Sequence, residues 1–399
     1  MDTLFNKINV FLDKYKLIIF FVLFFPSFYY AVTPIAIRFV NILDIVQYRL
    51  RFALFLISII IFIIKKKKPS LLLITILLDR IWLLGVTYFY NNVAILDTFH
   101  HSMNVLTISF LIDAYRDDLK SVVKSVMPYF EILMYINLII IFLFNSTKGY
   151  PQNNHYLLGY YNTMMVYAFP AIAVAIIYMY EYKKYIRASL LVIVSILTII
   201  FAKGSTPLGA LIAGIFVFCL QLLLSKTKAK KFKGTLSILF ILVIVFNIYI
   251  LTFFEPGQIN ILDLFITKVL NRSTTFTNRI CIWEKAIQMI TEKPLFGYGN
   301  STRIITDTGF IAEHAHNQFL QILIRSGFIG AIISSISHFV LIKKVDSAKN
   351  SIIKYAFIGL LFGIFLSYTT EAYLYEHRFY LVFFLSYYLD KIDTSNKRK

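Results

Sequence analysis

Charged residues are scarce in this sequence. They make up 15% of its 399 residues, whereas soluble domains contain about 25%. Hydrophobic residues reach 58%, above the roughly 45–50% of soluble domains. A water-soluble fold cannot bury this much apolar surface. The composition therefore excludes a soluble globular protein and predicts that most of the chain lies in a bilayer as one membrane-embedded domain.

Acidic residues are also few, 21 against 40 lysines and arginines, and the formal net charge is +19. In a soluble protein such an excess of positive charge would indicate binding to a polyanion. Here the basic residues gather in short segments between apolar runs, which is typical of cytoplasmic loops. We therefore expect the lipid bilayer, and no nucleic acid, as a partner.

The sequence has only two cysteines, Cys219 in an apolar run and Cys281 in the longest polar segment. Their different expected depths exclude a disulfide between them, and they form no metal-binding pattern. The first apolar run, from Leu17, lacks a small-residue cleavage site and is followed by similar runs. It is predicted to be a membrane anchor and not a removable signal peptide.

Twelve apolar runs approach the length of about 20 residues that a transmembrane helix needs. They predict an all-α fold: a polytopic membrane helical bundle of about twelve transmembrane helices, with a large extracytoplasmic loop before the tenth. The predicted spans are residues 17–37, 48–64, 70–90, 96–114, 124–144, 161–180, 187–203, 207–224, 235–254, 320–342, 353–373 and 378–392.

The segments after even-numbered spans are rich in lysine and arginine, and those after most odd-numbered spans are poor in them. This asymmetry predicts that both chain termini are cytoplasmic. It also divides the membrane domain into residues 1–254 with about nine spans, a loop of residues 255–319 with amphipathic helices, and residues 320–399 with about three spans.

The long loop contains basic residues on the side of the membrane where they are usually rare. The preference of lysine and arginine for cytoplasmic loops applies only to short loops, so basic residues can occur in this long outside loop. The rule gives no reason for their presence. Binding of an anion would explain them. The basic residues are Arg272, Arg279, Lys285, Lys293 and Arg303.

Residues 275–293 are predicted to form a short amphipathic helix at the membrane surface, with Asn278 as its N-cap and Pro294 as its stop. Its apolar face is expected at Ile280, Trp283, Ile287 and Ile290. Arg279 lies in the first turn, where a bound anion would meet both the guanidinium and unpaired backbone N–H groups. The alternative is a solvated arginine whose side chain bends away from the helix end.

Two further motifs follow in the long loop. Gly297 and Gly299 flank a tyrosine and allow either a sharp turn or a close approach to a ligand. His316 and Asn317 precede the tenth span, and a helix N-terminus favours neutral imidazole, which can accept a proton from a hydroxyl group. The alternative is a structural cap with solvated His314 and His316. Two histidines one residue apart share no helix face, so a metal-binding pair is not expected unless the segment is extended. No D-x-D pattern or tight carboxylate cluster lies beside them, and no divalent metal is expected.

A second candidate site is the short turn between the seventh and eighth spans. Lys203, Ser205 and Thr206 lie there, on the same predicted side as the long loop. Unpaired N–H groups in such a turn, together with the lysine, suit phosphate oxygens. The alternative is a lysine that extends its charged end to the membrane surface. Glu371, in the last outside turn, is expected to border the same site.

Four motifs in this order resemble the Wzy/O-antigen ligase superfamily. They are Arg279-x-x-x-Trp283, the Pro-Leu-Phe-Gly-Tyr-Gly of residues 294–299, His316-Asn317-x-Phe319-Leu320, and Gly327-x-x-Gly330. They cover residues 200–345 directly, and the twelve spans with a large loop before the tenth resemble that family over the full length.

The resemblance implies a metal-independent, inverting, membrane-embedded glycosyltransferase without cofactors. Such enzymes transfer a glycan from undecaprenyl pyrophosphate to an acceptor hydroxyl at the outer face of the bacterial inner membrane. Arg279 matches the arginine assigned to the pyrophosphate, and His316 matches the histidine assigned to acceptor activation. Lys203 and Arg303 are expected to assist at the pyrophosphate. A chain-length regulator protein is an implied partner.

Ligases of this superfamily carry an arginine where Lys203 stands, so the sequence favours a polymerase of surface-polysaccharide repeat units. The first alternative is an O-antigen ligase that transfers finished glycan to a terminal acceptor such as lipid A-core. The second is a non-catalytic flippase of lipid-linked oligosaccharide. That alternative predicts charges in many spans and two similar halves, whereas here the polar groups concentrate in one loop.

Overall fold

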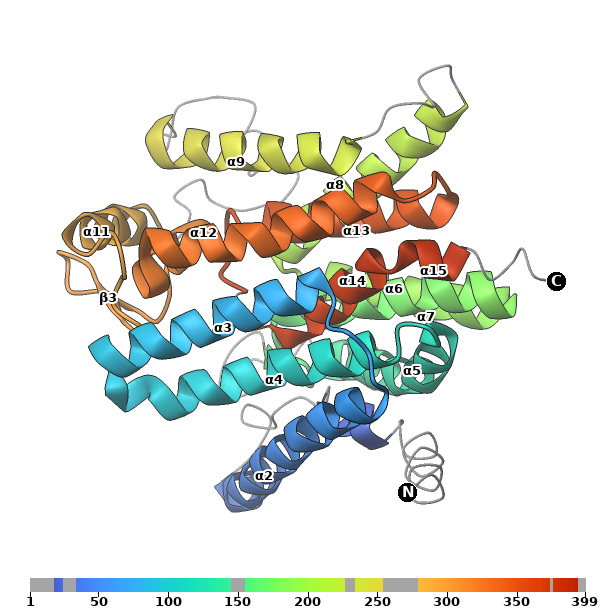
Figure 1. Ribbon diagram of the computed structural model, residues 1–399, viewed down its shortest axis with the longest axis horizontal. Helices are drawn as coiled ribbons and strands as arrows, with labels where there is room; N and C mark the ends of the chain where they lie inside the picture. Colours follow the sequence, from blue (N-terminus) through green and yellow to red (C-terminus); the bar gives the residue numbers. More distant parts are fainter. Residues whose placement is uncertain are drawn as a thin grey trace. The chain divides into compact units, whose positions relative to one another are not determined.

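The computed structural model describes residues 18–23, 34–144, 155–226, 234–253, 279–373 and 376–393. Within these ranges the chain is almost entirely helical (Figure 1). Its helices are α2 (Pro34–Ile64), α3 (Leu71–Tyr90), α4 (Ile95–Ala114), α5 (Leu119–Phe144), α6 (Met164–Tyr182), α7 (Tyr185–Ala202), α8 (Ser205–Ser225), α9 (Thr235–Phe253), α11 (Arg279–Glu292), α12 (Gln318–Ser347), α13 (Ile352–Ser367), α14 (His377–Tyr387) and α15 (Leu389–Asp393).

The remaining elements of the described ranges are very short. Two 3-10 turns, η2 (Asn92–Ala94) and η3 (Tyr161–Thr163), precede α4 and α6. Two antiparallel hairpins of two-residue strands complete the set, with β1 (His155–Tyr156) pairing with β2 (Gly159–Tyr160) and β3 (Ile304–Ile305) pairing with β4 (Ile311–Ala312). The predicted all-α fold is confirmed.

Seven described helices are long and apolar enough to cross a membrane, so the chain is a polytopic membrane protein. They lie at Leu71–Tyr90, Leu119–Leu143, Tyr161–Tyr182, Tyr185–Ala202, Ser205–Ser225, Thr235–Thr252 and Gln318–Ser347. Five of the predicted spans are not among these seven. Helices also occupy 48–64, 96–114, part of 353–373 and most of 378–392, whereas 17–37 is described only in part. The total of twelve spans therefore stays a prediction.

The span predicted at residues 353–373 ends earlier, because α13 stops at Ser367. Turns follow, in which the N–H groups of Thr369 and Glu371 donate to the carbonyls of Leu366 and Ser367. The polar residues of this stretch compete with the helix for hydrogen bonds. As a result Glu371 lies outside the helix, in an irregular segment.

The chain forms two compact units built from interleaved segments. The first combines Met1–Ser70, Met103–Pro207 and Glu376–Lys399, and the second combines Leu71–Ser102 and Leu208–Tyr375. The sequence analysis divided the chain into three consecutive segments, residues 1–254, 255–319 and 320–399. That division stays a prediction.

In the first unit, α5, α6 and α7 pack on one another, and α14 packs on α6. Helix α6 is buried along most of its length, with alanines at residues 168, 171, 173 and 175 that permit close helix packing. Asp113 of α4 is fully buried and accepts hydrogen bonds from the backbone N–H of Ser70 and the hydroxyl of Tyr388. This carboxylate therefore joins three distant segments inside the unit.

In the second unit, α12 is the central helix. It packs against α3 along its length and also contacts α9 and α11, while α9 packs on α13 (Figure 1). The hairpin of β3 and β4 packs near α11 through β3. All the residues of the long loop that are described belong to this unit.

Helix α12 is broken at Gly327, whose φ of 62° and ψ of −170° are not helical. Residues 294–299, which we call the strap, cross this break and supply the hydrogen bonds that the helix loses there. The bonds run from Tyr298 N to Ile324 O (2.7 Å), from Gly299 N to Arg325 O (3.0 Å), from Phe328 N to Pro294 O (2.8 Å) and from Ile329 N to Leu295 O (3.3 Å).

Both strap glycines have positive φ, 73° at Gly297 and 83° at Gly299. A Cβ atom at Gly297 would lie 2.5 Å from the Ile324 carbonyl oxygen, and one at Gly299 would lie 3.0 Å from the Thr87 Cα. The close approach predicted for these glycines is therefore an approach to the protein's own backbone. Their role is to seat the strap on α12 and α3.

Candidate active site at the start of helix α12

Helix α11 confirms the helix predicted at residues 275–293, although Asn278, its predicted cap, lies outside the described residues. The predicted apolar face is partly wrong, because Ile287 is exposed. The helix packs against both α12 and β3, and the face that these contacts bury is rotated from the predicted one. The buried residues are Ile282, Trp283, Ala286, Met289 and Ile290.

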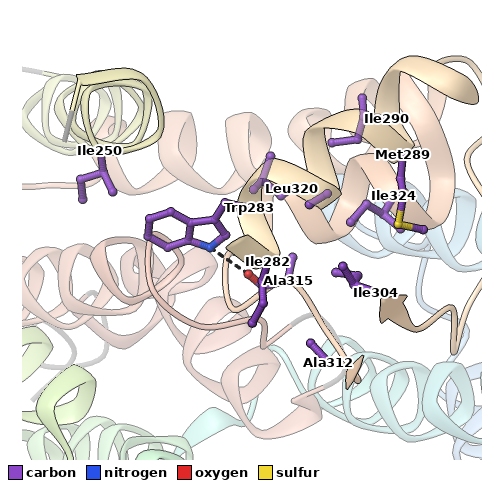
Figure 2. Close-up of a cluster of buried hydrophobic side chains, with 11 residues drawn as sticks. Ile250, Ile282, Trp283, Met289, Ile290, Ile304, Ala312, Ala315, Leu320 and Ile324 are labelled. Atoms are coloured by element: carbon purple, nitrogen blue, oxygen red, sulfur yellow. Dashed lines mark hydrogen bonds between the residues drawn. The ribbon is translucent and has the colours of Figure 1, made fainter. Parts of the chain in front are cut away.

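These side chains form a hydrophobic cluster with residues of α9, α12 and the β3–β4 hairpin (Figure 2). Burial of such apolar surface contributes about 25 cal/mol per Å², so the cluster holds α11 on α12. Figure 2 shows that the indole of Trp283 points to the chain just before α12, where its Nε1 donates to the carbonyl of Ala315 at 2.9 Å. Trp283 thus links α11 to the segment that carries His316.

Residues 313–317, which we call the histidine loop, are fixed by their own hydrogen bonds. Asn317 is the N-cap of α12, as its predicted position implies, and its side chain accepts from the N–H groups of Phe319 and Leu320. The N–H of Ala315 donates to Oε1 of Gln321 at 2.6 Å. His316 has a φ of 47°, in the left-handed region. This left-handed backbone conformation places His316 outside the regular helical geometry of α12.

Glu371 joins two of the residues that the sequence predicted to be functional, Arg279 and His316. Its Oε1 accepts from Nη2 of Arg279 at 2.7 Å, and its Oε2 lies 3.2 Å from Nδ1 of His316. The carboxylate is 7% exposed and the arginine 14%, whereas the imidazole is 32% exposed. The imidazole is therefore the member of this triad that is open to an incoming molecule.

Burial opposes ionisation of Glu371, but the hydrogen bond with His316 and the charge of Arg279 outweigh it. The pKa of Glu371 consequently lies below its ordinary value. An ionised carboxylate at Nδ1 holds the imidazole proton on that nitrogen and leaves Nε2 as a proton acceptor. The arrangement can act as a general base.

His314 lies beside His316, with ring centroids 4.0 Å apart, and its Nδ1 accepts from the N–H of His316 at 3.2 Å. Burial, reinforced by the neighbouring imidazole, lowers the pKa of His314 to about 4. Two histidines so close in sequence share no face of a helix, but this loop is not helical. The two rings and Glu371 present ligand atoms within 4.8 Å of one another, a grouping that the helical spacing did not predict.

Residues 190–335 match the family model described as O-antigen ligase. The resemblance drawn from the sequence motifs is confirmed. The match indicates a function of O-antigen ligase or polymerase type in a bacterial membrane, and with it lipid-linked polysaccharide substrates. No curated protein matches the chain.

The matched segment, residues 190–335, contains Lys203, Arg279 and His316, whereas Glu371 lies beyond its end. Lys203 forms the predicted turn, with a φ of 60° at the end of α7 and Ser205 beginning α8. Both residues belong to the first unit, and Arg279 and His316 belong to the second. That Lys203, Arg279 and His316 converge on one site stays a prediction.

Arg303 lies beside the β3–β4 hairpin and pairs with Glu313 at 3.2 Å. Both side chains are more than half exposed, so this pair is weak and the arginine can exchange its partner. Among the described residues, Arg303 therefore lies outside the Arg279–Glu371–His316 triad. Its predicted contact with an anion stays a prediction.

The sequence analysis missed two residues that hold the histidine loop. Gln321 receives the Ala315 N–H, and Asn247 of α9 accepts from Nδ2 of Asn317 at 2.6 Å. Asn247 is the only amide in the apolar run of residues 235–254, and an isolated polar residue in a span usually faces the bundle interior. This isolated polar position could have identified Asn247 from the sequence. For Gln321 the sequence shows only that it lies one turn after the N-cap of α12.

Replacing Trp283 with phenylalanine should loosen the histidine loop. The variant leaves the buried Ala315 carbonyl without its donor, which costs about 1–2 kcal/mol of unfolding free energy. We expect glycan transfer to fall up to about tenfold, because the imidazole loses its fixed position. The measurements are a thermal melt in detergent and the transfer rate.

The matched control is Trp82→Phe. Its indole donates to the Ser326 carbonyl at 3.1 Å, at the break of α12 where the strap crosses and not at the histidine loop. This control should be destabilised by a similar amount and keep its transfer rate. Equal losses of rate in both variants would show that Trp283 acts on the fold alone.

Proposed function

We propose that this protein is a polymerase of surface-polysaccharide repeat units. It transfers a glycan from undecaprenyl pyrophosphate to a hydroxyl group of another lipid-linked repeat unit. The observation that carries this proposal is the chain of contacts from Arg279 through Glu371 to His316. It supplies a cation for the leaving group and an oriented base for the attacking hydroxyl, and the transfer needs both.

In the proposed reaction, Nε2 of His316 removes the proton from the acceptor hydroxyl. The hydroxyl oxygen forms a bond to the anomeric carbon of the donor sugar while the bond from that carbon to the pyrophosphate oxygen breaks. Undecaprenyl pyrophosphate leaves with the bonding electrons. One direct displacement inverts the anomeric configuration, and the step uses no metal and no cofactor.

The negative charge that develops on the pyrophosphate is stabilised by Arg279 and Lys203, with Arg303 assisting. Glu371 accepts from Nη2 of Arg279, and the other N–H groups of this guanidinium can donate to phosphate oxygens. Ser205 adds a hydroxyl to the turn that presents Lys203. Trp283, Gly297, Gly299, Asn317 and His314 support the site by holding the histidine loop and the strap in place.

The site is proposed to face the periplasm or cell exterior, in a multi-pass protein of the bacterial inner membrane with both termini cytoplasmic. The basic segments between the apolar helices support this orientation. Helices that border the site hold the polyprenyl tail. A chain-length regulator protein is a proposed partner.

An O-antigen ligase is the second candidate, because the matching family model carries that description. Its chemistry is the same and only its acceptor differs. Lys203 favours the polymerase, since ligases of this superfamily carry an arginine there and a lysine cannot bind phosphate through two parallel hydrogen bonds.

Deleting the protein should distinguish these functions by the glycan that the cell makes. Loss of a polymerase leaves single repeat units on the terminal acceptor. Loss of a ligase leaves long chains on the lipid carrier, and loss of a flippase leaves single units on the cytoplasmic side. Gel separation of surface glycan and extraction of the lipid carrier measure both pools. Long chains on the carrier would overturn the polymerase proposal.

A further inference from the structure

The histidine loop and the turn after α13 bring together three side chains that commonly bind transition metals. His314, His316 and Glu371 each present one ligand atom, and these atoms lie within 4.8 Å of one another. Two imidazoles and one carboxylate form a frequent three-residue ligand set of zinc, with a fourth position left to water or another molecule. The partly exposed side chain of His316 leaves a path for such a molecule.

The distances suit a small ion. Bonds from zinc to nitrogen and to carboxylate oxygen are about 2.0–2.2 Å, so two ligand atoms of a tetrahedral site lie about 3.4 Å apart. Nδ1 of His316 and Oε2 of Glu371 are separated by 3.2 Å. An ion between them therefore replaces their shared hydrogen bond with little movement, and a rotation of the neighbouring His314 ring supplies the third ligand.

The surroundings supply the outer contacts that metal ligands need. Oε1 of Glu371 stays bonded to Arg279 at 2.7 Å while Oε2 turns to the ion. Asn317 holds the end of the histidine loop through the α12 cap, and Trp283 holds its middle through the Ala315 carbonyl. Such outer hydrogen bonds orient ligands and raise metal affinity. The adjacent guanidinium opposes a divalent cation, so we expect moderate affinity.

We propose that His314, His316 and Glu371 form an inhibitory zinc site, in which a bound Zn²⁺ occupies the imidazole that acts as the base. The ion is an inhibitor and not a cofactor. While Zn²⁺ is bound to Nδ1 of His316 and to Glu371, the proton of the neutral imidazole moves from Nδ1 to Nε2. Nε2 then has no lone pair to accept a proton, so the acceptor hydroxyl keeps its own. The inhibition rests on the proposed function, whereas the binding of zinc does not.

The first test measures binding without substrate. The full-length protein in detergent is treated with EDTA, freed of chelator and titrated with Zn²⁺ in a calorimeter, with the visible absorption of Co²⁺ as a second probe. The wild-type protein should bind one equivalent with moderate affinity. His314→Ala and Glu371→Gln should each weaken this binding at least about tenfold, as expected when one of three ligands is lost.

The matched control is His101→Ala. His101 also lies beside a carboxylate, with its Nε2 3.2 Å from Asp97, but it is not one of the three grouped ligands. This variant should bind zinc as tightly as the wild-type protein. A wild-type protein that binds no zinc, or a folded His314→Ala protein that binds it unchanged, would overturn the site. Thermal melts of each variant identify the folded proteins.

The second test measures transfer from the lipid-linked substrate. The EDTA-treated protein should be fully active, and stoichiometric Zn²⁺ should lower its rate at least about tenfold, with recovery on adding EDTA. One equivalent of bound zinc without inhibition would overturn the inhibitory role and keep the site. A protein that binds zinc but transfers no glycan under any condition would contradict the proposed function, and the binding test would still decide the metal site.

Discussion

The Arg279→Ala variant should transfer glycan at least about 100-fold more slowly than the wild-type protein. Removing a single preorganised donor that stabilises developing negative charge typically costs 10²–10³ in rate. Here the loss has a second origin, because Arg279 also neutralises the buried Glu371. Without it the buried carboxylate keeps its contact with His316 but loses the positive charge that balances its own.

Two further variants separate these effects. Arg279→Lys keeps a positive charge but loses the planar guanidinium, so its rate should lie between those of the alanine variant and the wild type. Lys285→Ala removes another cation from the same helix, one that pairs with Asp307 at 3.5 Å, and it should leave the rate unchanged. Rates of purified protein on lipid-linked substrate measure all three.

His316→Ala should be at least as slow as Arg279→Ala, and the double variant should be little slower than the slower single one. Residues that act as one unit give non-additive losses. If Arg279→Ala extends the substrate at the wild-type rate, Arg279 does not contact the leaving group. If the free-energy costs of the two single variants add up to that of the double variant, the two residues act separately.

The Gly297→Ala variant should be strongly destabilised, by roughly 3 kcal/mol or more in the free energy of unfolding. A positive φ of 73° costs an alanine about 1–2 kcal/mol. Its Cβ would also lie 2.5 Å from the Ile324 carbonyl oxygen and 2.8 Å from the Gly327 nitrogen. Both are backbone atoms, which cannot move away as a flexible side chain can. The strap would therefore separate from α12 and lose its hydrogen bonds.

Gly309→Ala is the control for backbone strain alone, since Gly309 has a φ of 79° and open space where its Cβ would lie. It should lose only about 1–2 kcal/mol. Gly85→Ala, in α3 with nothing near the added atom, should be neutral or slightly stabilising, because alanine favours helices over glycine. Denaturant or thermal unfolding in detergent measures the series. Equal losses at Gly297 and Gly309 would contradict the contact between strap and helix.

Several features of the fold followed from local patterns. The apolar runs predicted most of the helices, because hydropathy over about 20 residues reports directly on the lipid environment. Asn317 was placed at the start of α12 by the polar-to-apolar transition alone. Arg279 and His316 were identified because charged and titratable residues in a motif of known order carry the family resemblance.

Other local predictions were incomplete. The buried face of α11 turned out to include Ile282 and Met289 in place of Ile287, since periodicity defines a stripe but the neighbouring helix selects its centre. The predicted end of the span at residues 353–373 was wrong because hydropathy averages over a window and hides the turns that follow Ser367.

The role of Glu371 as the bridge required coordinates. Glu371 lies 92 residues from Arg279 and 55 residues from His316 in the chain. It follows an apolar helix, and no local sequence pattern indicates which residues it contacts. The pairing of His314 with His316 and the contact of Gly297 with the broken α12 were likewise hidden. Hydropathy and short motifs describe interactions over one or two helical turns. Which distant side chains meet is decided by how the helices pack, because each packing contact depends on all the others at once.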